Sequence, residues 1–194
     1  GGSLSGREPV VVDPATHRAE EVGDEPLLLA RAATTVIGVD RVAAAQLARR
    51  LGAEIAIMDD GLQNPSLTKD EAIAVIDAAV GVGNGLCLPA GPLRAPMARQ
   101  WDHVDAALIV GEGAPGARLA QEAAARGKRV LRARLVPDAG VVAALDGRPL
   151  LAFAGIGRPQ KFFATLAEAG LETRATQCFP DHHRFRPGEI DALL

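Results

Sequence analysis

The sequence has little cysteine, little net charge and no long hydrophobic run, and each shortage excludes a class of protein. Cys87 and Cys178 are the only cysteines, and they lie far apart in no metal-ligand spacing, which favours a reducing, cytoplasmic compartment without disulfides or structural zinc. The 21 basic and 24 acidic residues leave a net charge of −3, which argues against nucleic acid as a partner. No run approaches the roughly 18 apolar residues of a membrane span. Because the net charge is small and negative, any anionic ligand must be held by local groups.

What the sequence does have is enough hydrophobic material for a core, and the pattern of an α/β fold. Of its 194 residues, 48% are hydrophobic, and this length permits one large domain or two modest ones. Short β-branched runs alternate with longer Ala- and Leu-rich segments of helical period, which predicts a mostly parallel sheet with flanking helices. The strands predicted in the first part are residues 35–39, 54–58, 72–77 and 106–110, and the helices are residues 41–51 and 115–126.

The pattern changes after residue 131. Residues 132–147 read as two extended runs around Pro137-Asp138-Ala139-Gly140, which predicts a β-hairpin linker. Beyond it, a strand, a helix and a strand are predicted over residues 149–154, 159–169 and 171–178, as one βαβ unit. We therefore expect a first domain over residues 1–131, a linker over 132–147, and the start of a second, smaller α/β domain over 148–194.

Two pairs of carboxylates are candidates for metal chemistry. Asp59 and Asp60 follow the predicted strand at residues 54–58. Ligands of open α/β sheets bind outside the carboxyl ends of strands, and in P-loop enzymes a strand-end Asp helps hold magnesium. The same residues also fit an ordinary polar turn. Asp24 and Glu25 precede an apolar run, where Asp24 can act as a helix N-cap, or the pair can serve a metal ion and a substrate hydroxyl. These two interpretations are compatible.

Two glycine-containing loops are candidates for binding an anion. The long stretch at residues 83–94 ends at Arg94, which can clamp a phosphate in a bidentate manner or remain a solvated surface charge. Gly155-Ile156-Gly157 lies between a predicted strand and helix, where backbone N–H groups can hold an anion or the turn can simply close the corner.

A pair of histidines follows the last predicted strand. Phe179-Pro180-Asp181-His182-His183 places ionisable groups in a row at the carboxyl end of that strand. Neighbouring histidines point in divergent directions, so one proton-handling histidine is favoured over a shared metal ion. A structural role for either histidine remains the alternative.

Taken in order along the chain, these pieces resemble the tetraacyldisaccharide 4'-kinase family. The segments that carry the resemblance are Val22-Gly23-Asp24-Glu25-Pro26, Asp40-Arg41, Asp59-Asp60-Gly61-Leu62-Gln63, Lys69-Asp70, Gly83-Asn84-Gly85, Pro89-Ala90-Gly91-Pro92-Leu93-Arg94, Gly155-Ile156-Gly157 and Phe179-Pro180-Asp181-His182-His183. They run in the family's order across almost the whole chain, which makes the match highly specific.

The resemblance implies a kinase of lipid A biosynthesis. It implies transfer of the ATP γ-phosphoryl group to the 4'-hydroxyl of a tetraacylated disaccharide 1-phosphate, a glycolipid, with Mg2+ as cofactor. The implied place is the cytoplasmic face of the bacterial inner membrane, with peripheral membrane contact. The implied fold is a P-loop-kinase-like α/β domain joined by a short β linker to a smaller α/β domain.

The resemblance also implies roles for individual residues. Asp24 would act as base on the sugar hydroxyl, with His182 as its partner. The residues implied around the magnesium ion are Asp60, Asp59 and Glu25, and those implied at the substrate are Arg94, Gln63 and Asn64. Three positions depart from the family pattern: Asn64 stands where many members have His, Lys69 where Arg is common before Asp70, and Ala95 where Glu often follows the loop arginine. A role that needs a charged imidazole at position 64 is therefore in doubt.

The family's Walker A loop would precede the first residues of this chain, and its C-terminal remainder would follow Leu194. The start, Gly1-Gly2-Ser3, resembles neither a signal peptide nor a normal start. We therefore expect a fragment that is inactive as a kinase by itself. Two alternatives stay open: a nucleotide-sugar-dependent glycosyltransferase, since a carboxylate pair and a basic loop also suit a sugar diphosphate with a metal, and a non-catalytic remnant that binds lipid or a partner.

Overall fold

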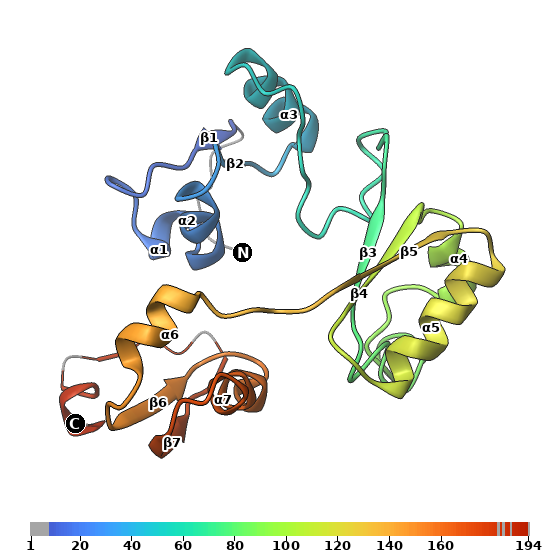
Figure 1. The fold of residues 1–194 in the computed structure, drawn as a ribbon. Coiled ribbons are helices and arrows are strands. Elements are labelled where there is room, and N and C mark those ends of the chain that lie inside the picture. Colours follow the sequence, from blue (N-terminus) through green and yellow to red (C-terminus); the bar gives the residue numbers. More distant parts are fainter. Residues whose placement is uncertain (1–7, 182, 184, 187, 194) are drawn as a thin grey trace. The chain divides into compact units, whose positions relative to one another are not determined.

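The chain divides into two compact α/β units between Ala133 and Arg134. The computed structural model describes residues 8–181, 183, 185–186 and 188–193 (Figure 1). No helix among these residues combines the length and the apolar character needed to cross a membrane. The elements of the first unit are β1 (Val10–Val11), α1 (Ala19–Val22), α2 (Asp24–Ala30), β2 (Val36–Ile37), α3 (Arg41–Arg50), β3 (Ile73–Asp77), α4 (Met97–Trp101), β4 (Ala106–Val110), α5 (Ala114–Ala125) and β5 (Arg129–Ala133). Those of the second are α6 (Ala139–Leu145), β6 (Leu150–Ala154), α7 (Pro159–Glu168), β7 (Thr173–Cys178) and the 3-10 helix η1 (Asp191–Leu193).

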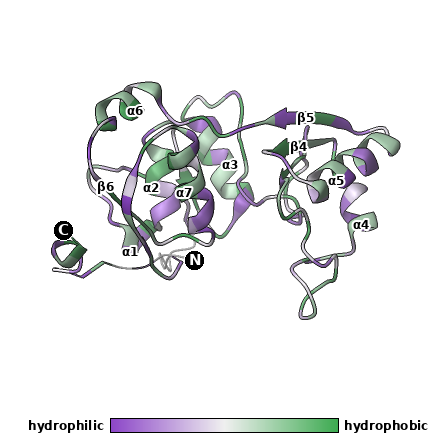
Figure 2. Ribbon diagram, turned by 60° about the horizontal axis from the view of Figure 1, so that its bottom comes forward, coloured by the Kyte–Doolittle hydropathy of each residue, from purple (hydrophilic) through white to green (hydrophobic). Residues whose placement is uncertain are grey.

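A parallel sheet forms the core of the first unit. Its 3 strands run in the order β3-β4-β5, with Ile73 opposite Ala106 and Ala106 opposite Arg129. The middle strand β4 is hydrophobic along its length, whereas β5 mixes hydrophilic and hydrophobic residues (Figure 2). Accordingly, Ala107 and Ile109 of β4 are at most 1% exposed. The predicted α/β class with parallel strands is confirmed.

Helix α5 packs against the end of β3 through a glycine. The backbone N–H of Gly116 donates to the Ala78 carbonyl at 2.9 Å. A Cβ on Gly116 would lie 2.5 Å from Ala78 Cα and 2.6 Å from its Cβ. The buried face of the helix contributes Leu119 and Ala123 to a core that also includes Trp101. The absence of a side chain at position 116 therefore sets how closely α5 approaches the sheet.

The predicted strand at residues 35–39 exists but belongs to another sheet. Its central part, β2, pairs antiparallel with β1 in a 2-stranded ribbon instead of joining the parallel sheet. The following helix α3 was predicted at residues 41–51. It begins after Asp40, whose carboxylate accepts from the N–H groups of Val42 and Ala43, because the first amides of a helix lack partners within it.

The predicted strand at residues 54–58 is wrong. The segment carries no strand assignment, and its Ile55 and Ile57 side chains are 82% and 93% exposed. A β-strand is stable when its backbone N–H and C=O groups pair with a neighbouring strand. No strand among the described residues pairs with this segment. The β-branched residues favour an extended backbone, but in the part of the chain that the structure describes this segment lacks the partner strand that would make it part of a sheet.

The βαβ prediction for the second unit is confirmed, and the hairpin before it is corrected. Strands β6 and β7 pair in parallel on either side of α7 in the sequence. Within residues 132–147, however, the second predicted extended run is helix α6. Its N-cap is Asp138, whose Oδ1 accepts from the Val141 N–H at 2.9 Å. This cap satisfies a free amide of the first turn, which favours a helix over a hairpin.

We expect Gly116→Ala to destabilise the first unit. Alanine improves helix propensity by up to about 1 kcal/mol, but the new methyl group collides with backbone and Cβ atoms of Ala78, and overpacking of this kind costs about 1–3 kcal/mol. The loss of stability from the collision should therefore exceed the gain from helix propensity. Chemical denaturation followed by Trp101 fluorescence measures it.

The matched control is Ala117→Ser, at the neighbouring exposed position of the same helix. It should change the free energy of unfolding by about 0.5 kcal/mol or less. A stability gain in Gly116→Ala would contradict the packing described.

Candidate functional site

Two of the residues expected at the site, Asp60 and Arg94, contact each other in the first unit. Asp59 and Asp60 occupy a turn, and Asp60 has a φ of 54°, an uncommon conformation for a residue other than glycine. An Asp60 Oδ2 atom lies 3.0 Å from an Arg94 guanidinium nitrogen, in side chains that are 77% and 58% exposed. An exposed ion pair is worth about 0–1 kcal/mol. The contact thus joins the two segments without contributing much stability by itself.

The loop that ends at Arg94 is held by its own hydrogen bonds. The Asn84 side chain donates from Nδ2 to the Ala90 carbonyl at 2.8 Å and accepts from the Leu86 N–H at 3.1 Å. The Leu88 N–H donates to the carbonyl of Leu93, at 2.9 Å, and Leu93 is buried. The glycine- and proline-rich stretch is therefore an ordered loop that presents Arg94 at its exit.

A second contact between the same segments involves a residue that the sequence did not single out. Gln63 Nε2 donates to Gln100 Oε1 at 3.2 Å, and Gln100 Nε2 donates to the Ala95 carbonyl at 2.8 Å. Gln63 was expected at the substrate, whereas Gln100 lies in α4 and carries no motif. Its only signal in the sequence is its position beside Trp101, the single tryptophan.

The Asn64 side chain is engaged in its own turn. Its Oδ1 accepts from the backbone N–H of Ser66 at 2.9 Å and from the Ser66 hydroxyl at 2.6 Å. Its backbone carbonyl accepts from Lys69 Nζ at 2.6 Å. Asn64 thus shapes the chain that follows the acidic turn, as asparagine commonly does in turns.

Asp24 and Glu25 begin helix α2. The N-cap is Gly23, with a φ of 92°, and Asp24 is the first helical residue, so the expectation of Asp24 as N-cap is shifted by one position. The Asp24 Oδ1 accepts from the Glu25 N–H at 3.1 Å. Both carboxylates lie in the first turn, where the helix dipole favours negative charge.

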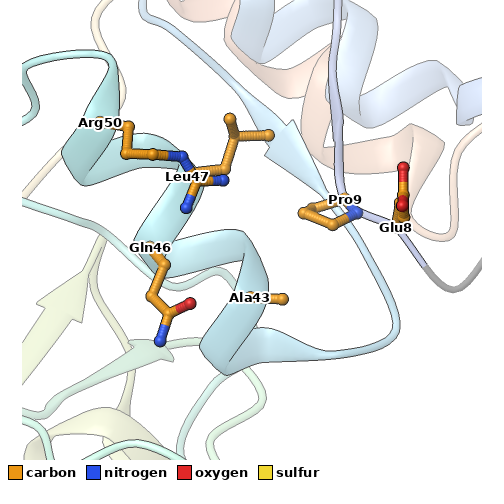
Figure 3. Close-up of a pocket in the computed structure, with 6 residues that line it drawn as sticks. All are labelled: Glu8, Pro9, Ala43, Gln46, Leu47 and Arg50. Carbon is orange, nitrogen blue, oxygen red and sulfur yellow. The ribbon is translucent and has the colours of Figure 1, made fainter.

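The three carboxylates expected around magnesium are not gathered in one group. Across residues 8–181 and the other described positions, no set of three or more His, Cys, Asp or Glu side chains is arranged to hold a metal ion. A surface hollow of ≈ 390 Å³ lies elsewhere, between α3 and the residues before β1 (Figure 3). Its lining residues are Glu8, Pro9, Ala43, Gln46, Leu47 and Arg50. None of the expected site residues is among them.

The histidine segment of the second unit packs against the glycine turn after β6. A Cβ on Gly155 would lie 3.1 Å from His183 Cβ and 3.2 Å from the Pro180 carbonyl oxygen. The two segments follow β6 and β7, which are parallel neighbours. The arrangement therefore brings both sequence motifs to the same edge of this sheet, and only a small residue fits at position 155.

His183 is anchored by a carboxylate and by aromatic rings. Its Nε2 lies 3.1 Å from Glu189 Oε2, and its ring stacks on Phe179 at 4.8 Å and meets Phe185 edge-on at 4.9 Å. The Arg186 N–H donates to the same carboxylate at 2.7 Å. The hydrogen bond from Arg186 has the larger effect and that from His183 the next; both lower the pKa of Glu189. His183 is thus built into the packing of this segment.

His182, the expected partner of Asp24, lies outside the described residues. Asp24 belongs to the first unit and position 182 to the second. The dyad therefore remains a hypothesis from the sequence.

Known proteins similar to this chain share one description. The family "LpxK: Tetraacyldisaccharide-1-P 4'-kinase" matches residues 1–194. A tetraacyldisaccharide 4'-kinase of Methylobacterium nodulans is 61% identical over 193 residues, which are 100% of this chain and 57% of that protein. One of Methylorubrum extorquens is 60% identical, covering 100% of this chain and 58% of that protein. The chain thus spans little more than half the length of these relatives.

A solved structure is also similar. It is the crystal structure of LpxK from Aquifex aeolicus in complex with ATP, with a TM-score of 0.67 and 26% sequence identity, covering 95% of this chain and 62% of that one.

We expect the Arg186 amide to report the titration of Glu189. A lowered pKa means that the ionised carboxylate is favoured in the folded state, so its stabilising contribution is complete above the ordinary value of 4.5 and is lost as the pH falls through the lowered pKa. The NMR shift of the Arg186 N–H should therefore titrate with a midpoint below 4.5.

Glu189→Gln should abolish that titration, because glutamine carries no ionisable group. Glu168→Gln, at an exposed position of α7, should leave it unchanged. A midpoint above the ordinary value would contradict the charge-stabilising environment of Glu189.

Proposed function

This chain belongs to the tetraacyldisaccharide-1-P 4'-kinase family, and on that premise we propose that the protein to which it belongs transfers the γ-phosphoryl group of ATP to the 4'-hydroxyl of a tetraacylated disaccharide 1-phosphate. The observation that carries the proposal is the family match over residues 1–194. The similar solved structure, described as a complex with ATP, supports ATP as donor. The acceptor is the substrate named by the family's description.

The acidic turn and the arginine loop suit phosphoryl transfer. Such reactions depend mainly on positioning and on neutralising the charge of the transferred group. Arg94 supplies a guanidinium, whose planar donors match phosphate oxygens, and Asp60 is its present partner at 3.0 Å. A phosphate that approaches Arg94 competes with Asp60 for the guanidinium, which leaves the carboxylate available for a cation.

The donor chemistry of the acidic residues fits magnesium. Asp59 and Asp60 are exposed carboxylates in one turn, and Mg2+ is bound through one or two carboxylates together with substrate phosphates. Asp60 and Asp59 would hold the ion, and the family resemblance adds Glu25 as a further ligand, although Glu25 is not grouped with them in this structure. When bound, Mg2+ neutralises charge on the phosphates. The Asp60 carboxylate and the Arg94 guanidinium are neighbours.

Gln63 and Asn64 remain candidates for contact with the acceptor. The Asn64 Oδ1 serves its turn with Ser66, so a substrate contact would come from the amide nitrogen Nδ2. Asp24 is assigned as the base that accepts the proton of the sugar hydroxyl, with His182 as its partner. Asp24 belongs to the first unit and position 182 to the second.

The acceptor also defines where the protein works. A tetraacylated sugar is held in a membrane by its acyl chains, since each buried CH₂ adds about 0.8 kcal/mol. The enzyme must therefore meet its substrate at a membrane surface, and ATP is supplied from the cytoplasm. Peripheral contact with the cytoplasmic face of the inner membrane follows from this pair of substrates.

The first test is the donor and acceptor specificity of the complete protein, extended at both ends to the length of its relatives. With ATP, Mg2+ and the tetraacylated disaccharide 1-phosphate, we expect phosphate at the 4'-position. Asp60→Asn keeps the size of the side chain but removes its charge, and it should lower turnover by more than the about ten- to hundredfold that loss of an outer-shell partner of a metal costs.

The control for Asp60→Asn is Glu54→Gln, which removes an equal charge from an exposed position of the preceding segment and should leave turnover unchanged. Sugar transfer from a UDP-sugar in place of phosphate transfer would overturn the kinase assignment.

The second test separates the two histidines. A positioned acid-base group contributes about a hundred- to ten-thousand-fold in rate, so His182→Ala should lower kcat by that range with little change in KM for ATP. Asp24→Ala should cost about as much, and the double variant no more, since the pair acts as a unit.

For His183→Ala we expect a different result, because His183 packs on Phe179 and pairs with Glu189. Its main effect should be a lower free energy of unfolding of the second unit, with kcat reduced about tenfold or less. Multiplicative losses for Asp24 and His182, or a dominant kcat effect at His183, would exclude the dyad.

A further inference from the structure

Gln100 lies between the buried Trp101 and two exposed segments of the proposed site, the acidic turn of Asp60 and the loop that ends at Arg94. It lies in α4 directly before Trp101, which is 1% exposed and whose indole N–H donates to Glu122 of α5 at 2.9 Å. Helices α4 and α5 lie side by side in the first unit (Figure 1). The backbone that carries Gln100 is therefore fixed to the core of this unit.

From that fixed point, the Gln100 amide reaches both segments. Its oxygen accepts from Gln63, which follows the acidic turn, at 3.2 Å, and its nitrogen donates to the carbonyl of Ala95, next to Arg94, at 2.8 Å. The Arg94–Asp60 ion pair joins the same two segments at 3.0 Å. Together these contacts close a ring. Its segments also meet the apolar interior at Leu62, which packs against the core beside Gln63, and at the buried Leu93 beside Arg94, and Gln100 adds polar contacts that join the two segments to each other.

The ring explains how an exposed ion pair can keep a defined geometry. An ion pair between two exposed side chains contributes little by itself, because both side chains lose conformational freedom when they meet. The Gln100 bridge limits the movement of both backbones before the charges meet. It therefore reduces the conformational freedom that the pair must lose.

We propose that Gln100 is a positioning residue, which holds the acidic turn of Asp60 and the loop of Arg94 in register for phosphoryl transfer. The proposal rests on the proposed function. It assigns Gln100 no contact with substrate. Its effect passes through Gln63 and through the Ala95 carbonyl to the residues that bind phosphate and metal.

The role requires both halves of the amide. Leucine at position 100 would lose both hydrogen bonds. Glutamate would keep an acceptor for Gln63 but would direct a charged oxygen, with no proton to donate, at the Ala95 carbonyl. Gln100→Glu and Gln100→Leu should therefore both fail, and Gln63→Leu should reproduce the part of the loss that passes through the acidic turn.

The test uses the complete protein and two readouts. In Gln100→Leu, kcat should fall by about ten- to a hundredfold, as small misplacements of catalytic groups do, with little change in KM for ATP. Amide hydrogen exchange at residues 60–64 and 93–96 should become faster, while Trp101 fluorescence stays unchanged because α4 remains packed. In hydrogen exchange, which does not depend on a substrate contact of Gln63, the double variant Gln63→Leu/Gln100→Leu should lose no more protection at residues 60–64 than Gln100→Leu alone.

Gln121→Leu is the matched control, since this glutamine is exposed on α5 of the same unit; it should change neither readout. Unchanged exchange in Gln100→Leu, a shift of Trp101 emission that reveals general loss of structure, or a further, independent loss of protection at residues 60–64 in the double variant would overturn the positioning role. Absence of phosphoryl transfer by the unsubstituted protein would refute the proposed function instead, and the exchange measurements would still decide whether Gln100 positions the two segments.

Discussion

The burial of β4 between β3 and β5 is the constraint on which the first unit depends. Ala107 and Ile109 of β4 are at most 1% exposed, so this strand tolerates neither a polar side chain nor a gap in its backbone pairing. The parallel register with both neighbours follows from it. Helix α5 then covers the buried face, and the close approach at Gly116 sets its distance from β3.

The two segments of the proposed site meet the interior at Leu62 and Leu93, and their charged side chains are held by polar contacts. Trp101 fills the core beside α5, and the adjacent Gln100 extends the order of the core to the loop of Arg94 and to the acidic turn. Charged groups with the phosphate- and metal-binding roles that we propose for Arg94 and Asp60 must stay exposed to reach their ligands, so burial cannot fix them. Polar contacts to a buried anchor are the alternative means of holding them.

In the second unit, the residues that follow the strands are held by a different set of contacts. Its two strands bring the Gly155 turn and the histidine segment to one edge of the sheet. There, His183 is held by the Phe179 ring and by the carboxylate of Glu189. Packing and pairing thus occupy the side chain of His183.

Composition and periodicity determined the α/β class, the parallel strands at residues 72–77 and 106–110, both long helices of the first unit and the βαβ unit of the second, because burial patterns repeat locally along the chain. Motif order determined the family. Pairing, by contrast, is a property of segments distant in sequence. For that reason only the tertiary structure showed that residues 54–58 lack a strand partner, that β2 joins β1, and that Gln100 links Gln63 to the Arg94 loop.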